Sequence, residues 1–387
     1  MNSFTKFPPS ANEYTENEFR SRVTEYFNTR IVSHYPTISK QNLSDRGIIL
    51  YGCAVLGKFI CDTLLAENVN IDWIVDKDSN LTGTYYHGVP IRSLDSLSET
   101  NTRFVMLCST HIQDMINTCK HYGVNDWIFP ASTNEWLWLC DFGITSQLDN
   151  LPQRAFDGFS LLADKKSRLV YDMNFQWYYL YNNDFSAIHD SVMYFPDDLA
   201  EIIDYSNFCD VGAYDGDILK NWVAKFAKET NYHYTAIEPD VKSYEQLVSY
   251  VNSLAIKDEI TTMNCAVGET NGTIQMTENS GKEITRVLQN NMPNSVNISL
   301  FTIDEIFKDK KVSFIKADVE GHEMPLLLGA LQTIKKQRPS LAISTYHRFS
   351  DIWELPMWVK SLNLDYDIYL RHFPKVFTDT VMFAIPR

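Results

Sequence analysis

The feature that most constrains the fold is a regular alternation of apolar and helical segments in the second half of the chain. From residue 205 onward, YSNFCDVG, HYTAIEPD, ITTMNCAVG, VSFIKADVEG and SLAISTYH each have the pattern of a strand, and most are followed by helical periodicity. Such an alternation forms a parallel sheet with right-handed crossovers. YDIYLRHF and DTVMFAIPR then follow each other with no helix between them. We therefore expect an α/β fold with a seven-stranded sheet whose last strand is inserted antiparallel.

A shorter series of the same kind comes earlier in the sequence. GIILYG, NIDWIVDKD, RFVMLCS and DWIFP are expected strands, and TGTYYHGVP is a turn-rich segment among them. We predict two Rossmann-like domains, at 46–131 and 196–387, with a helical segment at 1–45 and a helical connector at 132–195. One expected helix of the connector, 160–183, has an aromatic face that packs in the core, between the domains or against a second subunit.

Composition excludes several classes of partner. The 34 basic and 49 acidic side chains give a net charge of −15, which disfavours nucleic acids and anionic membranes because both attract a basic surface. No stretch approaches the ~20 apolar residues that span a bilayer, and the N-terminus lacks the apolar core of a signal peptide. The seven cysteines form no CxxC pair, which is typical of reduced thiols. We expect a cytoplasmic enzyme with a small-molecule or glycan acceptor, and homo-oligomerisation stays open.

The segment from Asp210 to Asp217, DVGAYDGD, lies between an expected strand and an expected helix. Gly212 and Gly216 allow positive φ and close approach of a ligand to the backbone, and the helix start offers free N–H groups. The loop lacks the GxGxxG spacing of a pyrophosphate site, and its carboxylates would repel phosphate. It suits a ligand with a cationic or zwitterionic amino-acid end. The alternative is a tight turn with a structural role.

The next expected strand ends at Glu238, 22 residues after Gly216. An acid at this position typically accepts hydrogen bonds from ribose hydroxyls. Glycine loop and acid together predict an adenosyl nucleoside, and a solvated strand-end acid is the alternative. The third strand ends in the small residues of NCAVG, which could flank an adenine ring.

The fourth and fifth expected strands also end in ionisable residues. Lys316 and Asp318 share one face, because strand side chains alternate, and Asp318 lies at the carboxyl end where open sheets bind ligands. A central-strand lysine needs a carboxylate partner, so Lys316 is expected to order the site. His347 ends the next strand, and an unperturbed imidazole titrates near neutral pH. We predict Asp318, His347 and Lys316 as catalytic residues, with a hydrogen-bonded structural role as the alternative for His347.

Over about residues 195–387 the motifs DVGAYDGD, IEPD, NCAVG, FTIDEIF, FIKADVEGHEMPLLLGA and STYHR resemble the FkbM family of class I S-adenosylmethionine-dependent methyltransferases. This resemblance implies that the glycine loop and Glu238 bind S-adenosylmethionine, with Asp318 beside its methyl group. Tyr214 departs from the family, which often has Asn there. The predicted cofactor site comprises Asp210, Gly212, Tyr214, Gly216, Asp217, Glu238, Pro239, Cys265, Ala266 and Val267.

The resemblance also implies O-methylation, because the family's acceptors are typically hydroxyl groups of sugars or natural products. We expect transfer to a carbohydrate or to a glycosylated or natural-product precursor, with His347 or Asp318 taking the hydroxyl proton. A divalent metal held near Asp318 would lower the pKa of that hydroxyl, although the sequence assigns no metal ligands. Two rival classes are a nucleotide-sugar-binding sensor or assembly module with a vestigial methyltransferase domain, and an NAD-dependent oxidoreductase.

A second nucleotide site is predicted at Gly52, Gly57 and Asp76. The two glycines are the outer ones of a GxGxxG motif, but Ala54 stands in the middle, where pyrophosphate needs close approach of the backbone. Asp76 follows Gly52 by 24 residues and could hold a ribose. Residues 46–131 resemble the small nucleotide-sugar-binding domain that precedes bacterial sugar acetyltransferases. The alternative is an empty scaffold that positions subunits or the acceptor.

Overall fold

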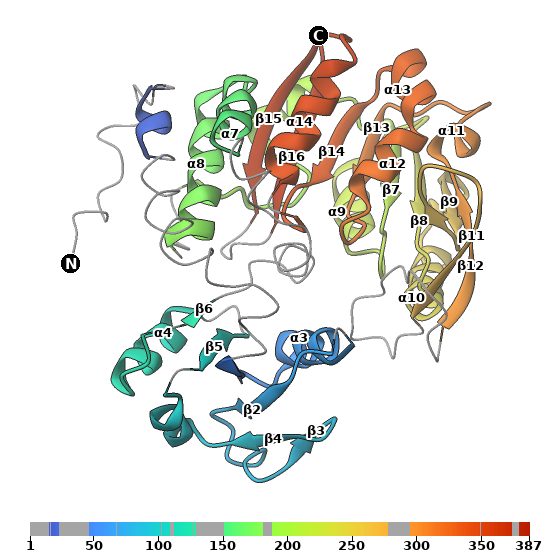
Figure 1. Ribbon diagram of the computed structural model, residues 1–387. Helices are drawn as coiled ribbons and strands as arrows, with labels where there is room; N and C mark the ends of the chain where they lie inside the picture. Colours follow the sequence, from blue (N-terminus) through green and yellow to red (C-terminus); the bar gives the residue numbers. More distant parts are fainter. Residues whose placement is uncertain are drawn as a thin grey trace. The chain divides into compact units, whose positions relative to one another are not determined.

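The computed structural model divides the chain into two compact units (Figure 1). The C-terminal unit comprises 1–19, 154–174 and 183–387, and the N-terminal unit comprises 20–153 and 175–182. The structure describes residues 15, 17–22, 46–66, 68–101, 103–108, 112–125, 127–128, 151–180, 188–277, 295–348, 350–373 and 379–387. Most of the helical segment expected at 1–45, and residues 132–150 of the expected connector, therefore lie outside the described residues.

The C-terminal unit is built on a seven-stranded sheet of order β15-β16-β14-β13-β7-β8-β9. Its strands are β7 (Asn207–Val211), β8 (His233–Ile237), β9 (Ile260–Met263), β13 (Phe314–Ala317), β14 (Ser340–Ser344), β15 (Tyr366–His372) and β16 (Thr380–Pro386). β16 is antiparallel to both of its neighbours, and the remaining pairs are parallel. The predicted seven-stranded sheet with an antiparallel last strand is confirmed.

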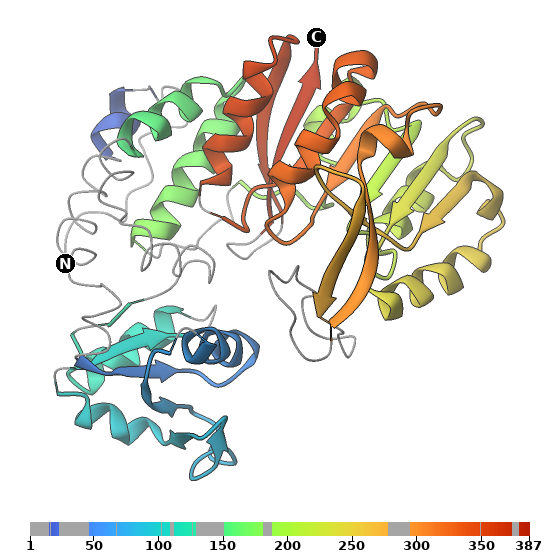
Figure 2. The same cartoon turned by 45° about the vertical axis from the view of Figure 1, so that its right-hand side comes forward.

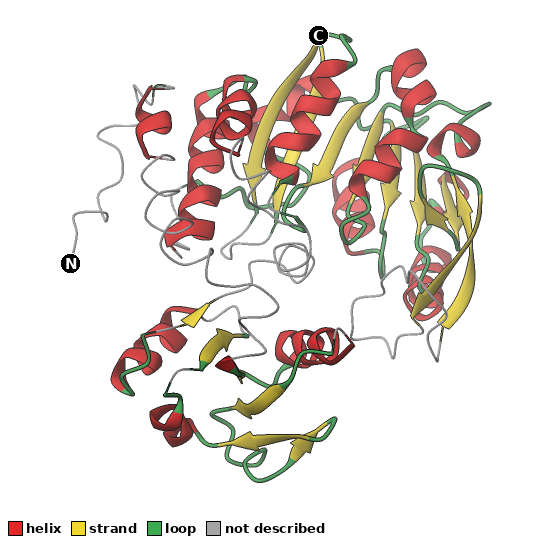
Figure 3. Cartoon of the chain, in the orientation of Figure 1, coloured by secondary structure: helices red, strands yellow, loops and turns green. Residues whose placement is uncertain are grey.

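Helices cover both faces of this sheet (Figure 3). They are α9 (Asp217–Phe226), α10 (Val241–Asn252), α11 (Ile303–Ile306), α12 (Glu323–Gly329), α13 (Leu331–Gln337) and α14 (Asp351–Ser361). The chain runs outward from β7 to β9 in one direction and from β13 to β14 in the other. Right-handed crossovers therefore place α9 and α10 on one face and α12 to α14 on the opposite face.

The core of this unit is rich in aromatic rings at the beginnings of the central strands. Phe208 stacks on Tyr234 with ring centroids 4.8 Å apart, and Phe314 lies 4.7 Å from Phe208 on its other side. All three side chains are buried. These rings form the core near the amino ends of the central strands, and Asp210 and Lys316 follow further along β7 and β13, towards the glycine loop.

One local expectation is wrong, and one helix starts later than expected. ITTMNCAVG is not one strand, because Asn264 turns the chain by donating to the carbonyl oxygen of Glu238 at 2.8 Å. The residues that follow form a separate three-stranded sheet of β10 (Ala266–Val267), β11 (Gly272–Thr277) and β12 (Ser295–Phe301) (Figure 2). The helix expected at 160–183 is confirmed as α8 (Lys165–Leu180), which begins later than expected because Asp164 accepts from Ser167 N at 2.7 Å, and a further helix, α7 (Leu151–Ser160), precedes it.

The N-terminal unit has a six-stranded sheet of order β3-β4-β2-β1-β5-β6. Its elements are β1 (Ile48–Tyr51), α3 (Val55–Ala66), β2 (Ile71–Val75), β3 (Tyr85–Tyr86), β4 (Val89–Arg92), a 3-10 helix (Leu94–Glu99), β5 (Phe104–Leu107), α4 (Ile112–His121) and β6 (Trp127–Ile128). The expected turn-rich segment contains the β3–β4 hairpin, whose turn residues His87 and Gly88 have φ of 46° and 84°. In the described ranges, every helix falls short of the length and apolar character that a membrane crossing requires.

Candidate active site

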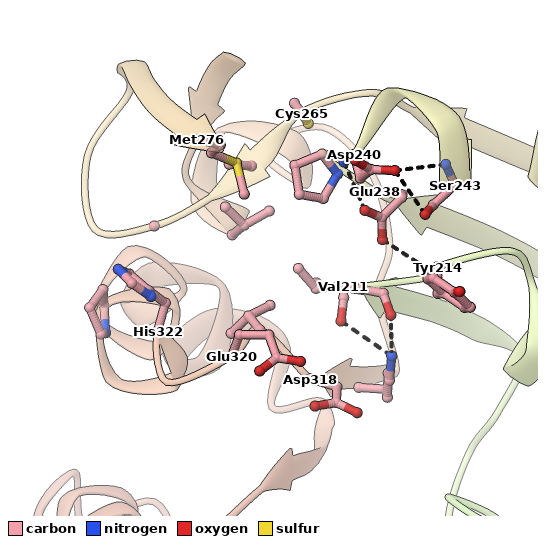
Figure 4. A pocket seen from close by; sticks show the side chains of 18 of the residues that line it. Val211, Tyr214, Glu238, Asp240, Ser243, Cys265, Met276, Asp318, Glu320 and His322 are labelled. Atoms are coloured by element: carbon pink, nitrogen blue, oxygen red, sulfur yellow. Dashed lines mark hydrogen bonds between the residues drawn. The ribbon is translucent and has the colours of Figure 1, made fainter. Parts of the chain in front are cut away.

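A cavity of about 590 Å³ opens at the carboxyl ends of β7, β8 and β13 (Figure 4). Its wall includes most of the predicted cofactor and catalytic residues, namely Gly212, Tyr214, Asp217, Glu238, Pro239, Cys265, Ala266, Val267, Lys316 and Asp318. Asp210, Gly216 and His347 do not line it. The structure thus brings residues from more than 100 positions apart to one place, as the parallel strand order requires.

The glycine loop is tightly fitted against the end of β13. Gly212 has φ of 77°, and a Cβ added there would lie 2.0 Å from the carbonyl oxygen of Asp318. The Gly212 N–H donates to Ile237 O at 3.0 Å, and the Asp318 N–H donates to Val211 O at 3.1 Å. These bonds tie the ends of β7, β8 and β13 together, and only glycine meets both the conformation and the space at position 212.

Beneath the loop lies a buried ion pair. Lys316 Nζ is 2.8 Å from Asp210 Oδ1, and it also donates to the carbonyl oxygen of Gly212 at 2.6 Å. Tyr234 donates its hydroxyl to the other oxygen of Asp210 at 2.5 Å. Burial alone would lower the pKa of Lys316, but the Asp210 carboxylate raises it above its ordinary value, so the lysine is charged. Asp210 is therefore the carboxylate partner that Lys316 required, and it acts on the cavity through Lys316.

Glu238 reaches the cavity from the end of β8. Its two oxygens accept backbone hydrogen bonds from Tyr214 and Asp240, each at 2.8 Å. Burial raises the pKa of Glu238 to about 7, although both hydrogen bonds oppose that shift. The acid that the sequence singled out for a ribose thus also braces the glycine loop at Tyr214.

Asp318 is held as a carboxylate by the groups around it. Tyr346 donates its hydroxyl to Asp318 Oδ1 at 2.9 Å, and Tyr194 donates to Oδ2 at 3.1 Å. Burial would raise the pKa of Asp318, but the charges of His347 and Lys316 and the two hydroxyl donors keep it below its ordinary value. A negative charge is therefore fixed at the cavity wall.

His347 lies behind Asp318, among three carboxylates. Its Nδ1 is 2.7 Å from Glu323 Oε1, and its Nε2 is 3.4 Å from Asp318 Oδ1 and 3.6 Å from Glu320 Oε2. Burial would lower the pKa of His347, but these carboxylates, Glu323 first, raise it to about 10. The expectation that it titrates near neutral pH is wrong, because an imidazolium surrounded by acids cannot take a proton at pH 7.

Residues 210–372 match a family model described as the methyltransferase FkbM domain. This part of the chain is an FkbM methyltransferase domain. A crystal structure of methyltransferase FkbM from Methylobacillus flagellatus KT matches with TM-score 0.68 and 20% identity, covering 96% of this chain and 100% of its own, which shows the fold. No curated protein matches the sequence.

Two further solved methyltransferases are less similar. The human methyltransferase 10 domain containing protein has TM-score 0.31 and 11% identity, and the match covers 48% of this chain and 74% of that one. The methyltransferase PaMTH1 from Podospora anserina, solved with SAH bound, has TM-score 0.29 and 10% identity, and the match covers 47% and 72% of the two chains. Neither carries an argument about the ligand of the FkbM methyltransferase domain.

The cavity of this methyltransferase domain includes residues that the sequence analysis did not select. Glu320 and His322, on the loop between β13 and α12, lie across the cavity from Met276 (Figure 4). Burial lowers the pKa of His322 below its ordinary value, so its imidazole is neutral at pH 7. Both residues belong to the segment DVEGHE of a motif quoted above, so the sequence places them near the end of β13. Whether their side chains face the cavity depends on the turn at Gly321, which the sequence does not reveal. Ile274, Met276 and Leu300 add an apolar wall from the three-stranded sheet.

In the N-terminal unit, the structure also brings the three predicted residues together. Gly52 has φ of 112°, and a Cβ added to Gly57 would lie 1.9 Å from the carbonyl oxygen of Gly52. Asp76 accepts hydrogen bonds from Cys53 N at 2.6 Å and from Asp78 N at 2.8 Å. The close packing of α3 against the turn at Gly52 is enough to require glycine at position 57. Both carboxylate oxygens of Asp76 already accept backbone hydrogen bonds.

Proposed function

We propose that this protein transfers a methyl group from S-adenosylmethionine to a hydroxyl of a carbohydrate or of a glycosylated or natural-product precursor. The observation that carries the cofactor assignment is the cavity itself, where a glycine loop, a strand-end glutamate and a patch of small apolar residues face one space. The sugar-type acceptor rests on the resemblance to the FkbM family described above.

The parts of the cavity match the parts of the cofactor. The loop at Gly212 and Asp217 suits the amino-acid end, and Glu238 suits the two ribose hydroxyls. Cys265 and Val267 offer an apolar slot for adenine. The fixed negative charge of Asp318 favours a cationic sulfonium over the neutral thioether of the product, because opposite charges attract strongly in a partly buried site.

The reaction is an in-line displacement. The acceptor oxygen forms a bond to the methyl carbon as the carbon–sulfur bond breaks, the electron pair of that bond stays on sulfur, and S-adenosylhomocysteine leaves. The hydroxyl proton passes to a group on the wall, for which His322, neutral at pH 7, and the carboxylate of Asp318 are the two candidates that line the cavity. Most of the rate would come from alignment of donor and acceptor.

Calorimetric titration of the full chain tests the cofactor. S-adenosylhomocysteine is expected to bind with one site per chain, and NAD is expected to bind far more weakly. A vestigial methyltransferase domain would bind neither, and an oxidoreductase would prefer NAD. A screen of hydroxylated acceptors, with S-adenosylhomocysteine release as the readout, then tests O-methylation.

A further inference from the structure

Beside the cavity lies a cluster of ionisable side chains at the start of α12. We propose that Asp318, Glu323 and His347 form a binding site for a divalent transition-metal cation. Each residue offers one ligand atom, and the three atoms lie within 4.8 Å of one another. One imidazole nitrogen with carboxylate oxygens is the donor set that Mn²⁺, Fe²⁺, Co²⁺ and Zn²⁺ share, whereas Ca²⁺ and Mg²⁺ prefer oxygen alone.

A buried oxygen of Glu323 carries the argument furthest. The Glu323 side chain is 1% exposed, and its Oε2 has no hydrogen-bond partner among the described residues. A buried carboxylate oxygen without a partner costs free energy, and a bound ion is one of the few explanations for such a group in a folded protein. This observation is independent of the spacing of the three residues.

The charge of the cluster points the same way. Glu320 contributes a third carboxylate, 3.6 Å from the imidazole of His347. A protonated His347 supplies one positive charge to three acids, and Lys316, which is paired with Asp210, shares its single charge between Asp210 and Asp318. A divalent cation in place of one proton would bring the cluster nearer to neutrality, and buried acids need such compensation.

The candidate ligands are held in place by hydrogen bonds from outside the cluster. Tyr194 and Tyr346 donate to Asp318, at 3.1 Å and 2.9 Å. The backbone N–H of Val319 donates to Glu323 Oε1 at 3.2 Å. Such outer partners are typical of metal sites, where they orient the ligands and tune affinity. His347 needs no large movement, because each ring nitrogen already faces a carboxylate within 3.4 Å.

The proposed site lies next to the cavity, where a bound cation could take part in the reaction. Asp318 lies on the cavity wall, so a cation bound to it would be within reach of an acceptor in the cavity. If the proposed methyl transfer is correct, the cation would lower the pKa of the acceptor hydroxyl and spare the need for a strong base. Binding of the cation itself does not depend on that function.

The test uses the full chain with Co²⁺ as the probe. After dialysis against EDTA and transfer to metal-free buffer at pH 8, wild type is expected to bind one Co²⁺ per chain with visible d–d absorption. Substitution H347A is expected to weaken Co²⁺ binding by at least tenfold. The matched control is H233A, which removes an exposed histidine 3.0 Å from a single carboxylate, Glu259, and should bind Co²⁺ as wild type does.

A second measurement covers the case in which H347A fails to fold, as judged by far-ultraviolet circular dichroism. Electron paramagnetic resonance of wild type with one equivalent of Cu²⁺ is expected to show coupling to one imidazole nitrogen. The proposal is overturned if wild type takes up no Co²⁺ at 1 mM, if folded H347A binds it equally well, or if the Cu²⁺ spectrum shows no nitrogen coupling. S-adenosylhomocysteine titrated in EDTA separates this outcome from failure of the proposed function, because cofactor binding needs no cation.

Discussion

The two units hold their strand-end acids in the same way. Asp76 and Glu238 each accept one backbone hydrogen bond from the loop after the first strand and one from the residue two positions further along the chain. In each unit a glycine with positive φ, Gly52 or Gly212, begins that loop. The pairing of a glycine turn with an acid about 20 residues later is therefore first a device that braces a loop. By itself it does not distinguish a cofactor site.

What differs between the units is charge beneath and beside the loop. In the N-terminal sheet Leu50 is paired in register with Met106, whereas at the corresponding place in the C-terminal sheet Asp210 is paired with Lys316. The apolar pair is buried at no electrostatic cost. The two charges of the ion pair, by contrast, are fully buried, so each needs the other as its counter-charge. Because its lysine also holds the carbonyl oxygen of Gly212, the ion pair fixes the cavity floor.

The residue that contacts the glycine differs as well. A Cβ on Gly52 would come 2.9 Å from the carbonyl oxygen of Cys108, and one on Gly212 would come 2.0 Å from that of Asp318. Cys108 is buried and neutral, since burial raises the pKa of its thiol, while Asp318 is a carboxylate on the cavity wall. We conclude that charged residues on a common scaffold make the C-terminal unit the candidate site.

The largest effect is expected when Lys316 alone is replaced by methionine, the residue at the corresponding position of the N-terminal sheet (Met106). Substitution K316M leaves Asp210 buried without its counter-charge and should lower the free energy of unfolding by about 3–5 kcal/mol. Adding D210L and Y234F, which removes the hydroxyl that bonds Asp210, should recover most of that loss. Urea denaturation of the full chain measures both. If K316M alone is as stable as the triple variant, the ion pair does not have the role given to it.

The next effect compares the two acids. Substitution E238A should weaken S-adenosylhomocysteine binding at least tenfold, because hydrogen bonds to a charged acceptor contribute about 1.5–3 kcal/mol each and about 1.4 kcal/mol is one decade. The matched variant D76A removes the acid that braces the other loop and should leave that affinity unchanged. Calorimetric titration gives both values. Equal losses in the two variants would mean that the acids act only through stability.

A smaller change is expected from the charge of Asp318. Substitution D318N keeps the shape but removes the carboxylate, so the preference for S-adenosylmethionine over S-adenosylhomocysteine should fall by roughly tenfold, a Coulomb effect of about 1–2 kcal/mol. Competition binding in EDTA isolates this effect from any bound cation. An unchanged preference would place the sulfonium away from Asp318.

The smallest effect is a pH dependence confined to one unit. Burial raises the pKa of Glu238 to about 7, so its carboxylate is present above that pH and is lost below it. S-adenosylhomocysteine affinity should therefore level off above about pH 8 and should fall roughly threefold between pH 7.5 and pH 6.5, in step with the ionised fraction of Glu238. Substitution E238Q should bind more weakly but with a flat profile between pH 5 and 8. A wild-type profile in E238Q would assign the dependence to another group.

Much of the fold could be predicted because it depends on local pattern. Two consecutive strands with no helix between them determined the antiparallel β16, and strand alternation placed Lys316 and Asp318 on one face. The split at Asn264 could not be predicted, because it depends on a side-chain bond to a distant carbonyl. Nor could β10, which is two residues long.

The candidate site was predicted in its positions more than in its electrostatics. The pKa of His347 depends on where Glu320 and Glu323 point, and that follows from two consecutive left-handed residues, Glu320 and Gly321, with φ of 55° and 91°. No spacing in the sequence reveals such a turn. Likewise, only the register of β7 against β13 shows that Asp210 is the residue that forms the ion pair with Lys316.

The most direct test of the central claim is hydrogen–deuterium exchange of the full chain with and without S-adenosylhomocysteine. Exchange rates of the two glycine loops are then measured in the same sample. We expect slower exchange at 212–218, at 238–240 and at 265–268, with no change at 52–54 or 76–78. Protection confined to the N-terminal loop, or equal protection of both loops, would contradict the assignment of the cofactor to the charged unit.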